Sequence, residues 1–377
     1  MFAWVSALML VQTTPAIPSS EILVRGERAE NALAKCLSRS CTVPDDVRLS
    51  MAVAEAQFGL GRYRDARDTL GRSLARTQGE VARYPRLVAA LHEANATVNR
   101  HIGDQEAYSS AVAAQAATLR RYLPADDMQR RLLPLTLADA WLERGNVKAA
   151  MALYGDAQRQ FAKQGDTRLA AMAGLRRVAI LLGQKKVAEA RNALAALPDD
   201  AVEDSSIKAV HAVLASRIAQ AMGDESGIDR LIGTLRTASD EAPILVREGP
   251  PVADLRVQPR DRQTPFDLSV NQGAAVSSDP IRWVDIGYLI RPDGTVGDAQ
   301  ILRGKGDRGW AEPYIESLTQ RRYAPPTLTD GRPGLYRVER LTRRARLIVP
   351  TGSFIRQPVG PVTVERQDLT YPEVASK

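Results

Sequence analysis

The stretch IRPDGTVGDAQILRG, residues 290–304, decides the fold of the C-terminal part of the chain. Apolar and polar residues alternate on both sides of Pro292-Asp293-Gly294. Alternation with a period of two is typical of a half-buried strand, and Asp-Gly between two such runs predicts a tight turn. The stretch therefore predicts a β-hairpin, in a chain of 377 residues whose earlier part is patterned almost entirely as helix.

The residues around the hairpin extend it into a small α+β unit at 281–350. Strands are predicted at 283–291 and 295–303, followed by a helix at 307–322 whose apolar side chains fall on one side. A third long strand is predicted at 335–349. The expected order of elements is β-β-α-β.

This unit resembles the C-terminal domain of TonB-type energy transducers. In place of the family's Ser-Ser-Gly the chain has Gly304-Lys305-Gly306, and Tyr314 and Ser317 occupy positions that are usually Ala, so the resemblance is to a divergent member. The segments that carry the resemblance are Ile290-Arg-Pro-Asp-Gly-Thr-Val296, Ala299-Gln-Ile-Leu302, Arg322-Tyr-Ala-Pro325, and Asp330-Gly331 with the strand that follows.

The resemblance implies protein binding by strand addition. Members of the family capture a short extended segment of an outer-membrane receptor beside the last strand, whose edge offers free N–H and C=O groups. The family's energy transducers also carry a membrane-spanning N-terminal helix and a long Pro-rich spacer, which this sequence does not show. We therefore expect the domain to serve as a binding module without coupling to an inner-membrane motor.

The helical part shows a repeat with a period near forty. Glycines follow apolar helical runs at intervals of 42, 42, 38 and 40 residues. Each is expected to end one helix in a positive-φ conformation, with a second amphipathic helix directly after it. Four prolines are expected to fall between helix pairs. The glycines are Gly61, Gly103, Gly145, Gly183 and Gly223, and the prolines are Pro85, Pro124, Pro134 and Pro198.

Residues 45–238 resemble a divergent array of tetratricopeptide repeats. The segments that carry the resemblance are LGRYRDARDTL (60–70), WLERGNVKAAMALY (141–154) and LLGQKKVAEARNAL (181–194). Each has a small residue at the first helix end and an Ala at or near the close contact in the next helix, at Ala66, Ala149-Ala150 and Ala190. The resemblance implies an α-helical solenoid with a concave groove that binds proteins or peptides. A purely structural spacer is the alternative.

The predicted organisation begins with a signal peptide at 1–16. An apolar run of about ten residues is too short to span a bilayer, which needs roughly 20, and Thr14-Pro15-Ala16 fits a cleavage site. No Lys or Arg precedes the run, so an upstream start or a partly buried first helix is the alternative. We expect a periplasmic protein with no transmembrane span in the mature chain. The remaining parts are a helical repeat domain at 20–240, a linker at 241–280, the TonB-like domain at 281–350 and an extended tail at 351–377.

The two cysteines, Cys36 and Cys41, are separated by four residues. Close spacing in an exported chain favours a local disulfide. Two thiolates without nearby His or further Cys cannot complete a tetrahedral metal site, so no metal is expected. Two free buried thiols are the alternative.

The net charge of +7 is concentrated in the C-terminal unit, where residues 281–349 hold 13 Arg or Lys against 8 Asp or Glu. Five of these arginines lie on the third predicted strand, which we expect to be a sheet edge. They would prevent edge-to-edge aggregation and favour an acidic peptide partner, although they could also serve only to keep the edge soluble. The predicted partner-binding residues are Arg337, Arg340, Arg343, Arg344 and Arg346.

No catalytic constellation is recognisable in the sequence. The three histidines, His92, His101 and His211, lie in helical segments, and the sequence holds no phosphate-binding glycine loop, nucleophile elbow or H-E-x-x-H motif. We expect no enzyme, no catalytic residue, no cofactor and no nucleic-acid partner. The predicted function is an exported adaptor that binds proteins or peptides, such as a receptor segment, in the bacterial envelope. The alternative is an envelope-surface binder whose basic terminal domain contacts anionic glycan or lipid headgroups.

Overall fold

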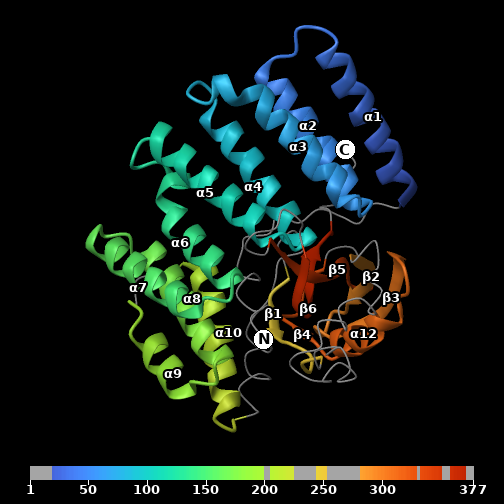
Figure 1. Ribbon diagram of the computed structural model, residues 1–377. Helices are drawn as coiled ribbons and strands as arrows, with labels where there is room; N and C mark the ends of the chain where they lie inside the picture. The colour runs from blue at the N-terminus through green and yellow to red at the C-terminus, as the bar shows by residue number, and fades with distance from the viewer. Residues whose placement is uncertain are drawn as a thin grey trace, which may run out of the picture.

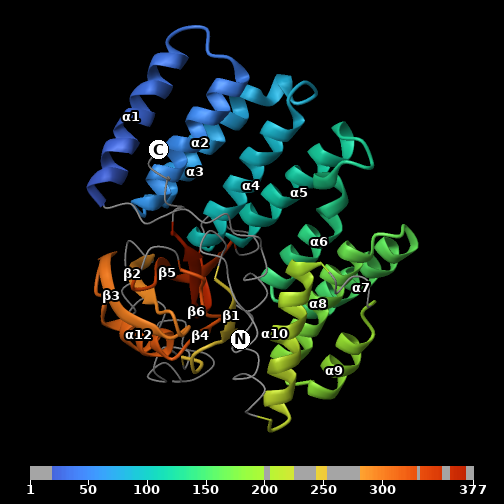
Figure 2. The ribbon, with the colours of Figure 1, turned by 180° about the vertical axis from the view of Figure 1, so that it is seen from behind.

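The computed structural model describes residues 19–198, 204–224, 243–252, 281–328, 332–349 and 357–370. This part of the chain is mostly helical, with a small antiparallel sheet domain near its C-terminus. The helices follow one another in an arc, and the sheet lies on the inner side of that arc (Figures 1 and 2). A helical array followed by an α+β domain is therefore confirmed.

Antiparallel neighbours form the array, and each helix packs chiefly against the next one along the chain. Its buried cores are rich in Ala and Leu, which lets neighbouring helices approach closely. The helices are α1 (Ser19–Leu37), α2 (Val43–Gly59), α3 (Tyr63–Thr77), α4 (Pro85–Ile102), α5 (Gln105–Tyr122), α6 (Met128–Glu143), α7 (Val147–Lys163), α8 (Thr167–Gly183), α9 (Val187–Ala195) and α10 (Ser205–Ala221), with a 3₁₀ turn η2 (Gln78–Glu80) after α3.

The turns between helices follow the predicted glycines, with one exception. Gly61, Gly103, Gly145 and Gly223 have positive φ, as expected where a helix ends. Gly183 was predicted to be such a residue and is not, because it is the last residue of α8 and the positive φ falls on Lys185.

This shift places the small residues of the three repeat-like segments in one register. Ala66, Ala150 and Ala190 each lie five positions after the positive-φ residue of their turn, and each is fully buried. The α7–α8 turn at Gly165, which the repeat pattern did not include, has the same conformation. Pro134 was predicted to separate helix pairs, but it lies inside α6.

The sheet contains four antiparallel strands in the order β3-β2-β5-β6. Helix α12 (Glu312–Thr319), preceded by the 3₁₀ turn η6 (Gly309–Ala311), packs over one face and buries Trp310 and Leu318 against apolar strand residues. The predicted turn between the first two strands is present, and Gly294 is required there because a Cβ atom would lie 2.1 Å from the carbonyl oxygen of Tyr323. The strands are β2 (Arg282–Ile290), β3 (Val296–Lys305), β5 (Leu335–Ile348) and β6 (Gln357–Asp368).

Two segments predicted to lie outside the TonB-like domain contribute strands. The region predicted as an extended tail, 351–377, contains β6, so the sheet has a strand that the expected β-β-α-β order lacked. The region predicted as a linker, 241–280, contributes the short strand β1 (Leu245–Arg247), which pairs with β4 (Arg322–Tyr323). The rest of that linker and the predicted signal peptide lie outside the described residues.

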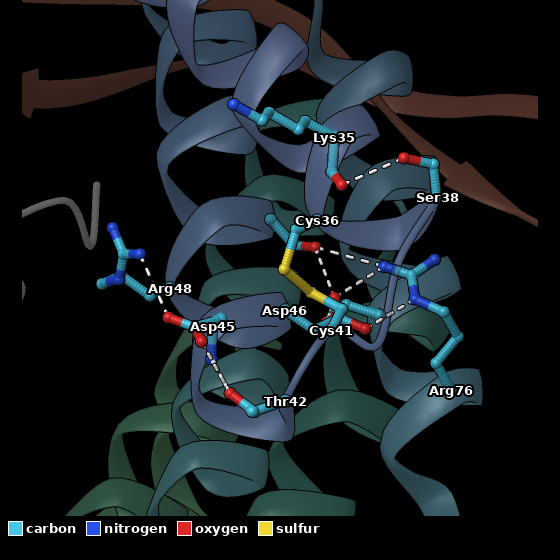
Figure 3. The surroundings of a disulfide bond; sticks show 11 residues. Lys35, Cys36, Ser38, Cys41, Thr42, Asp45, Asp46, Arg48 and Arg76 are labelled. Atoms are coloured by element: carbon cyan, nitrogen blue, oxygen red, sulfur yellow. Dashed lines mark hydrogen bonds and ion pairs between the residues drawn. A yellow bond between two sulfur atoms is a disulfide. The ribbon is translucent and has the colours of Figure 1, made fainter.

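The predicted disulfide between Cys36 and Cys41 is present and ties the end of α1 to the start of α2 (Figure 3). Thr42 caps α2, since its hydroxyl accepts from the backbone N–H of Asp45. Behind the disulfide, the guanidinium of Arg76 on α3 donates to both carboxylate oxygens of the buried Asp46 at 2.6 and 2.7 Å. The first three helices are therefore joined by one covalent and one ionic link.

We predict that the Cys36→Ser/Cys41→Ser variant loses about 2 kcal/mol of unfolding free energy, because the short closed loop no longer restricts the unfolded chain. Urea unfolding of the oxidised wild type, the reduced wild type and the variant measures the effect. The reduced wild type should match the variant. Equal stability of all three would contradict a structural role for the bond.

Candidate protein-binding site

Strand β5, which carries the five predicted binding arginines, is not a sheet edge. It pairs with β2 along Arg282–Ile290 and with β6 from Glu339 to Ile348. The prediction of an edge was wrong because the segment predicted as an extended tail contains β6, whose sequence includes Pro358 and Pro361. Proline is tolerated in a strand that lies at an edge, which is the position of β6.

Arg340 lies at the centre of the interface between the sheet and the helix array. Its side chain is fully buried, and its Nε and Nη2 atoms donate to the two carboxylate oxygens of Asp285 at 2.6 and 2.9 Å. The other Nη N–H groups reach the carbonyl oxygens of Phe58 and Gly59 at 2.6 and 2.7 Å and the hydroxyl of Tyr63 at 3.5 Å. All five N–H donors of the guanidinium thus have an acceptor, which is what a buried arginine requires.

The two carbonyl groups that Arg340 reaches belong to the last turn of α2. The final carbonyls of a helix lack intrahelical donors and carry the negative end of the helix dipole. A cation from the sheet therefore caps a helix of the array. The α4–α5 turn is bound in a similar way, because the carbonyl oxygen of Gly103 accepts from the backbone N–H of Leu347 at 2.9 Å.

Trp283 on β2 fills the space between the two parts of the molecule. Its ring packs in the same buried cluster as Tyr63, Leu70 and Leu91 of the helices, and the Arg340 guanidinium lies 4.0 Å from the ring centroid. A Cβ atom on Gly61 would lie 2.0 Å from the indole nitrogen. The helical turn must therefore be glycine both for its positive φ and for the approach of the tryptophan.

A chain of hydroxyl groups links Arg340 to the buried His101 on α4. The Tyr63 hydroxyl lies 3.0 Å from the Thr342 hydroxyl, which lies 3.1 Å from His101 Nδ1. Because a guanidinium only donates, Tyr63 can accept from it and donate to Thr342, which then donates to a neutral imidazole. Burial, reinforced by the charges of Arg100, Arg344 and Arg340, holds the pKa of His101 well below its usual value.

Two further predicted binding arginines are engaged by acidic residues of β6. Arg337 forms an ion pair with Asp368. Arg344 pairs with Glu365 at 3.1 Å, and Glu365 also lies 3.3 Å from Arg100 of α4. These charges join the sheet internally and to the array.

The last two predicted binding arginines are more accessible. Arg343 is half-buried, and burial together with the nearby Arg282 lowers its pKa. Arg346 is exposed. Neither forms an ion pair with another described residue. Among the described residues, therefore, two of the five arginines have no acidic partner.

Strands β3 and β6 form the two edges of the described sheet. The pairing of β3 with β2 is interrupted at two places, and Asp298 on β3 has positive φ. The pairing of β6 with β5 is interrupted at one place, between Val359 and Thr363, and is continuous from Thr363 to Asp368. The latter edge is the more regular template for another strand.

The sheet face turned away from α12 carries exposed apolar side chains. Tyr336 on β5 and Leu302 on β3 are 46% and 43% exposed, and both lie against Gly287 of β2. Neither residue was predicted from the sequence to bind a partner. Their alternation with buried neighbours places them on one face, but the sequence does not show that the helices cover only part of that face.

Within the described ranges, no group of three or more His, Cys, Asp or Glu side chains is placed to hold a metal ion. His101 belongs to the interface, while burial lowers the pKa of His92 and His211 within their helices. None of the described helices is both long and apolar enough to cross a membrane.

Comparisons with known proteins identify no family for the chain. No protein-family model matches it, and no curated protein does. Among solved structures, the crystal structure of BtubC (BKLC) from P. vanneervenii is similar at a TM-score of 0.42 and 14% identity, over 56% of this chain and 89% of that chain. A likeness this distant bears on neither the fold nor the function of the chain.

We predict that Arg340→Met costs about 3–5 kcal/mol of unfolding free energy, because the buried Asp285 carboxylate is left without its partner. Urea unfolding followed by circular dichroism measures the loss. Arg346→Met, the same change at the exposed arginine of the same strand, should stay within about 0.5 kcal/mol of the wild type. Equal effects of the two substitutions would show that Arg340 does not hold the interface.

We predict that His101 makes the protein less stable in mild acid. Its folded-state pKa lies below the ordinary value of 6.5, so below that pH the unfolded chain binds a proton that the folded chain does not. The unfolding free energy should then fall by up to about 1.4 kcal/mol per pH unit more steeply than in His101→Gln. Urea unfolding of both proteins between pH 7.5 and about pH 5 checks this, and parallel curves would contradict it.

Proposed function

We propose that the protein is an exported adaptor that binds protein or peptide partners in the periplasm of a bacterial cell. In this proposal the array is a tetratricopeptide-like solenoid and the sheet domain is a TonB C-terminal-like module. The regular burial of Ala66, Ala150 and Ala190 at one position after each turn supports the first assignment. The hairpin, the following helix and the long β5 support the second. A disulfide, which forms in oxidising compartments, supports export.

The observation that carries the proposal is the edge of β6 beside the helix array, with which no second strand of the described residues pairs. Residues 363–368 pair continuously with β5 on one side only, and Glu365 on this strand contacts Arg100 of α4. A segment added to this edge would gain backbone hydrogen bonds and could reach array residues as well. Strand addition is therefore proposed at β6 in place of β5.

The alternative, an envelope-surface binder, depends on free positive charge on the terminal domain. Arg337, Arg340 and Arg344 are paired with acidic groups of the same chain and cannot supply it. The exposed apolar Tyr336 and Leu302 also suit a protein partner better than anionic headgroups. We therefore favour the adaptor.

The proposal is tested by site-specific photo-crosslinking in the cell envelope. A photoreactive amino acid at the exposed Thr363 of β6 should give discrete protein adducts, whereas one at the exposed Arg64 of α3 should not. Deleting the sheet domain is a poor substitute, because it would uncover the core around Tyr63 that Trp283 fills.

The partner captured in this way must also be shown to bind by strand addition. We predict that backbone amides of 363–368 exchange more slowly with solvent when the captured partner is added in purified form, because a new strand pairs with them. Adducts of the same kind from both positions, or unchanged exchange at β6, would contradict strand addition at this edge.

A further inference from the structure

A cavity of about 640 Å³ lies at the outer edge of the array, between the end of α5, the start of α6 and the end of α7. Helix α5 begins at the turn that contacts β5, and its 18 residues lead away from the sheet by about 27 Å. Figure 2 shows that the connection between α5 and α6 lies at the end of these helices that is away from the sheet. The cavity is thus separate from the edge of β6.

The walls of the cavity combine apolar and positively charged groups. Leu133, Pro134 and the buried Phe161 line it. Around them lie three arginine side chains and the amide side chains of Gln160 and Gln164. A ligand site usually combines apolar wall surface with converging polar groups, and this cavity has both.

Three arginines face the cavity, against a single acidic residue, Asp126. Arg131 forms an ion pair with Asp166, and Arg130 donates to the carbonyl oxygen of Leu123 at 2.7 Å, so both side chains are held in position. Arg120 is exposed and forms no ion pair with another described residue. The cavity therefore offers prepositioned donors and one free cation to an anionic group.

The same face of α6 continues the surface beyond the cavity. Arg130, Pro134, Trp141 and Arg144 follow one another at helical spacing, which puts them in one stripe along the helix. Trp141 is 38% exposed, and the Arg144 guanidinium lies 5.0 Å from its ring. Exposed Trp and Arg side chains are the residues that most often dominate protein interfaces.

We propose that this cavity and the Trp141–Arg144 pair bind an acidic protein segment, with an apolar side chain seated against Phe161 and carboxylates on the arginines. The choice of occupant rests on charge complementarity and on the continuation of the cavity into an exposed tryptophan. The inference rests on the proposed adaptor function, since it names a class of partner for the array that is distinct from the strand captured by β6.

The test uses an array of immobilised peptides composed of Glu, Leu, Phe and Ser in varied order, probed with the full-length protein. Peptides with both acidic and apolar residues should bind. Versions with Lys for Glu, or with Ser for every apolar residue, should not. The affinity of the best peptide for the wild-type protein and for three variants is then measured in solution by fluorescence anisotropy.

Arg120→Glu should weaken binding about tenfold or more, since it reverses the free charge. Gln160→Trp should also weaken it about tenfold, because the exposed Gln160 can be enlarged to fill the cavity without a change to the core. Arg64→Glu, the same charge reversal at an exposed site on α3, should leave the affinity within twofold. Thermal unfolding confirms that each variant is folded.

Equal binding of the acidic and basic peptides, no binding by any peptide, or unchanged affinity in both cavity variants would overturn this site. The proposed function fails separately. If the label at Thr363 captures partners while the cavity variants bind peptide normally, the adaptor function is supported and the cavity is rejected as a binding site. If the acidic peptides bind in the predicted way but no partner is captured at β6, the cavity is supported as a binding site and strand addition at β6 is rejected.

Discussion

The buried guanidinium of Arg340 is the interaction on which the rest of the structure depends. Removing an arginine and an aspartate from water costs several kcal/mol per charge, and the loss is offset only when every remaining donor finds an acceptor. Here the acceptors come from both parts of the chain: Asp285 from the sheet, and the carbonyls of Phe58 and Gly59 from the end of α2. The pairing is satisfied only when the sheet is docked on the helices.

This constraint fixes the sheet domain relative to the helix array. Helical arrays and small sheet domains joined by linkers usually move independently. In this protein Trp283 belongs to the helical core, and Arg217 of α10 donates to the carbonyl groups of β1. The four-stranded sheet thus contacts helices near the start of the array, and the separate β1–β4 pair contacts its last described helix. The two proposed binding surfaces are consequently held at fixed positions relative to each other, with the β6 edge on the inner side of the arc and the α5–α7 cavity on its outer edge.

Local patterns in the sequence were sufficient to predict elements but not their partners. The period-two runs around Gly294 predicted the hairpin, and glycines predicted most helical turns. The residues that Arg340 contacts in α2 are 282 and 281 positions away, and nothing in its own strand indicates them. Arginines on an exposed edge and arginines in a buried ion pair look alike in sequence, since burial depends on the fold. The strand β6 was not predicted, and its two prolines, which are typical of a tail as well as of a sheet edge, do not distinguish the two in sequence.

The central claim, that the buried pair holds the sheet at one position on the array, is tested most directly by a distance distribution between spin labels. Labels on cysteines introduced at the exposed Lys148 of α7 and Gln300 of β3 would span the two parts. We predict one narrow distribution for the wild-type background and a broad one once Arg340 is replaced by Met. A broad distribution in both proteins would show that the sheet is not fastened to the helices. An equally narrow one in both would show that Arg340 is not what fastens it.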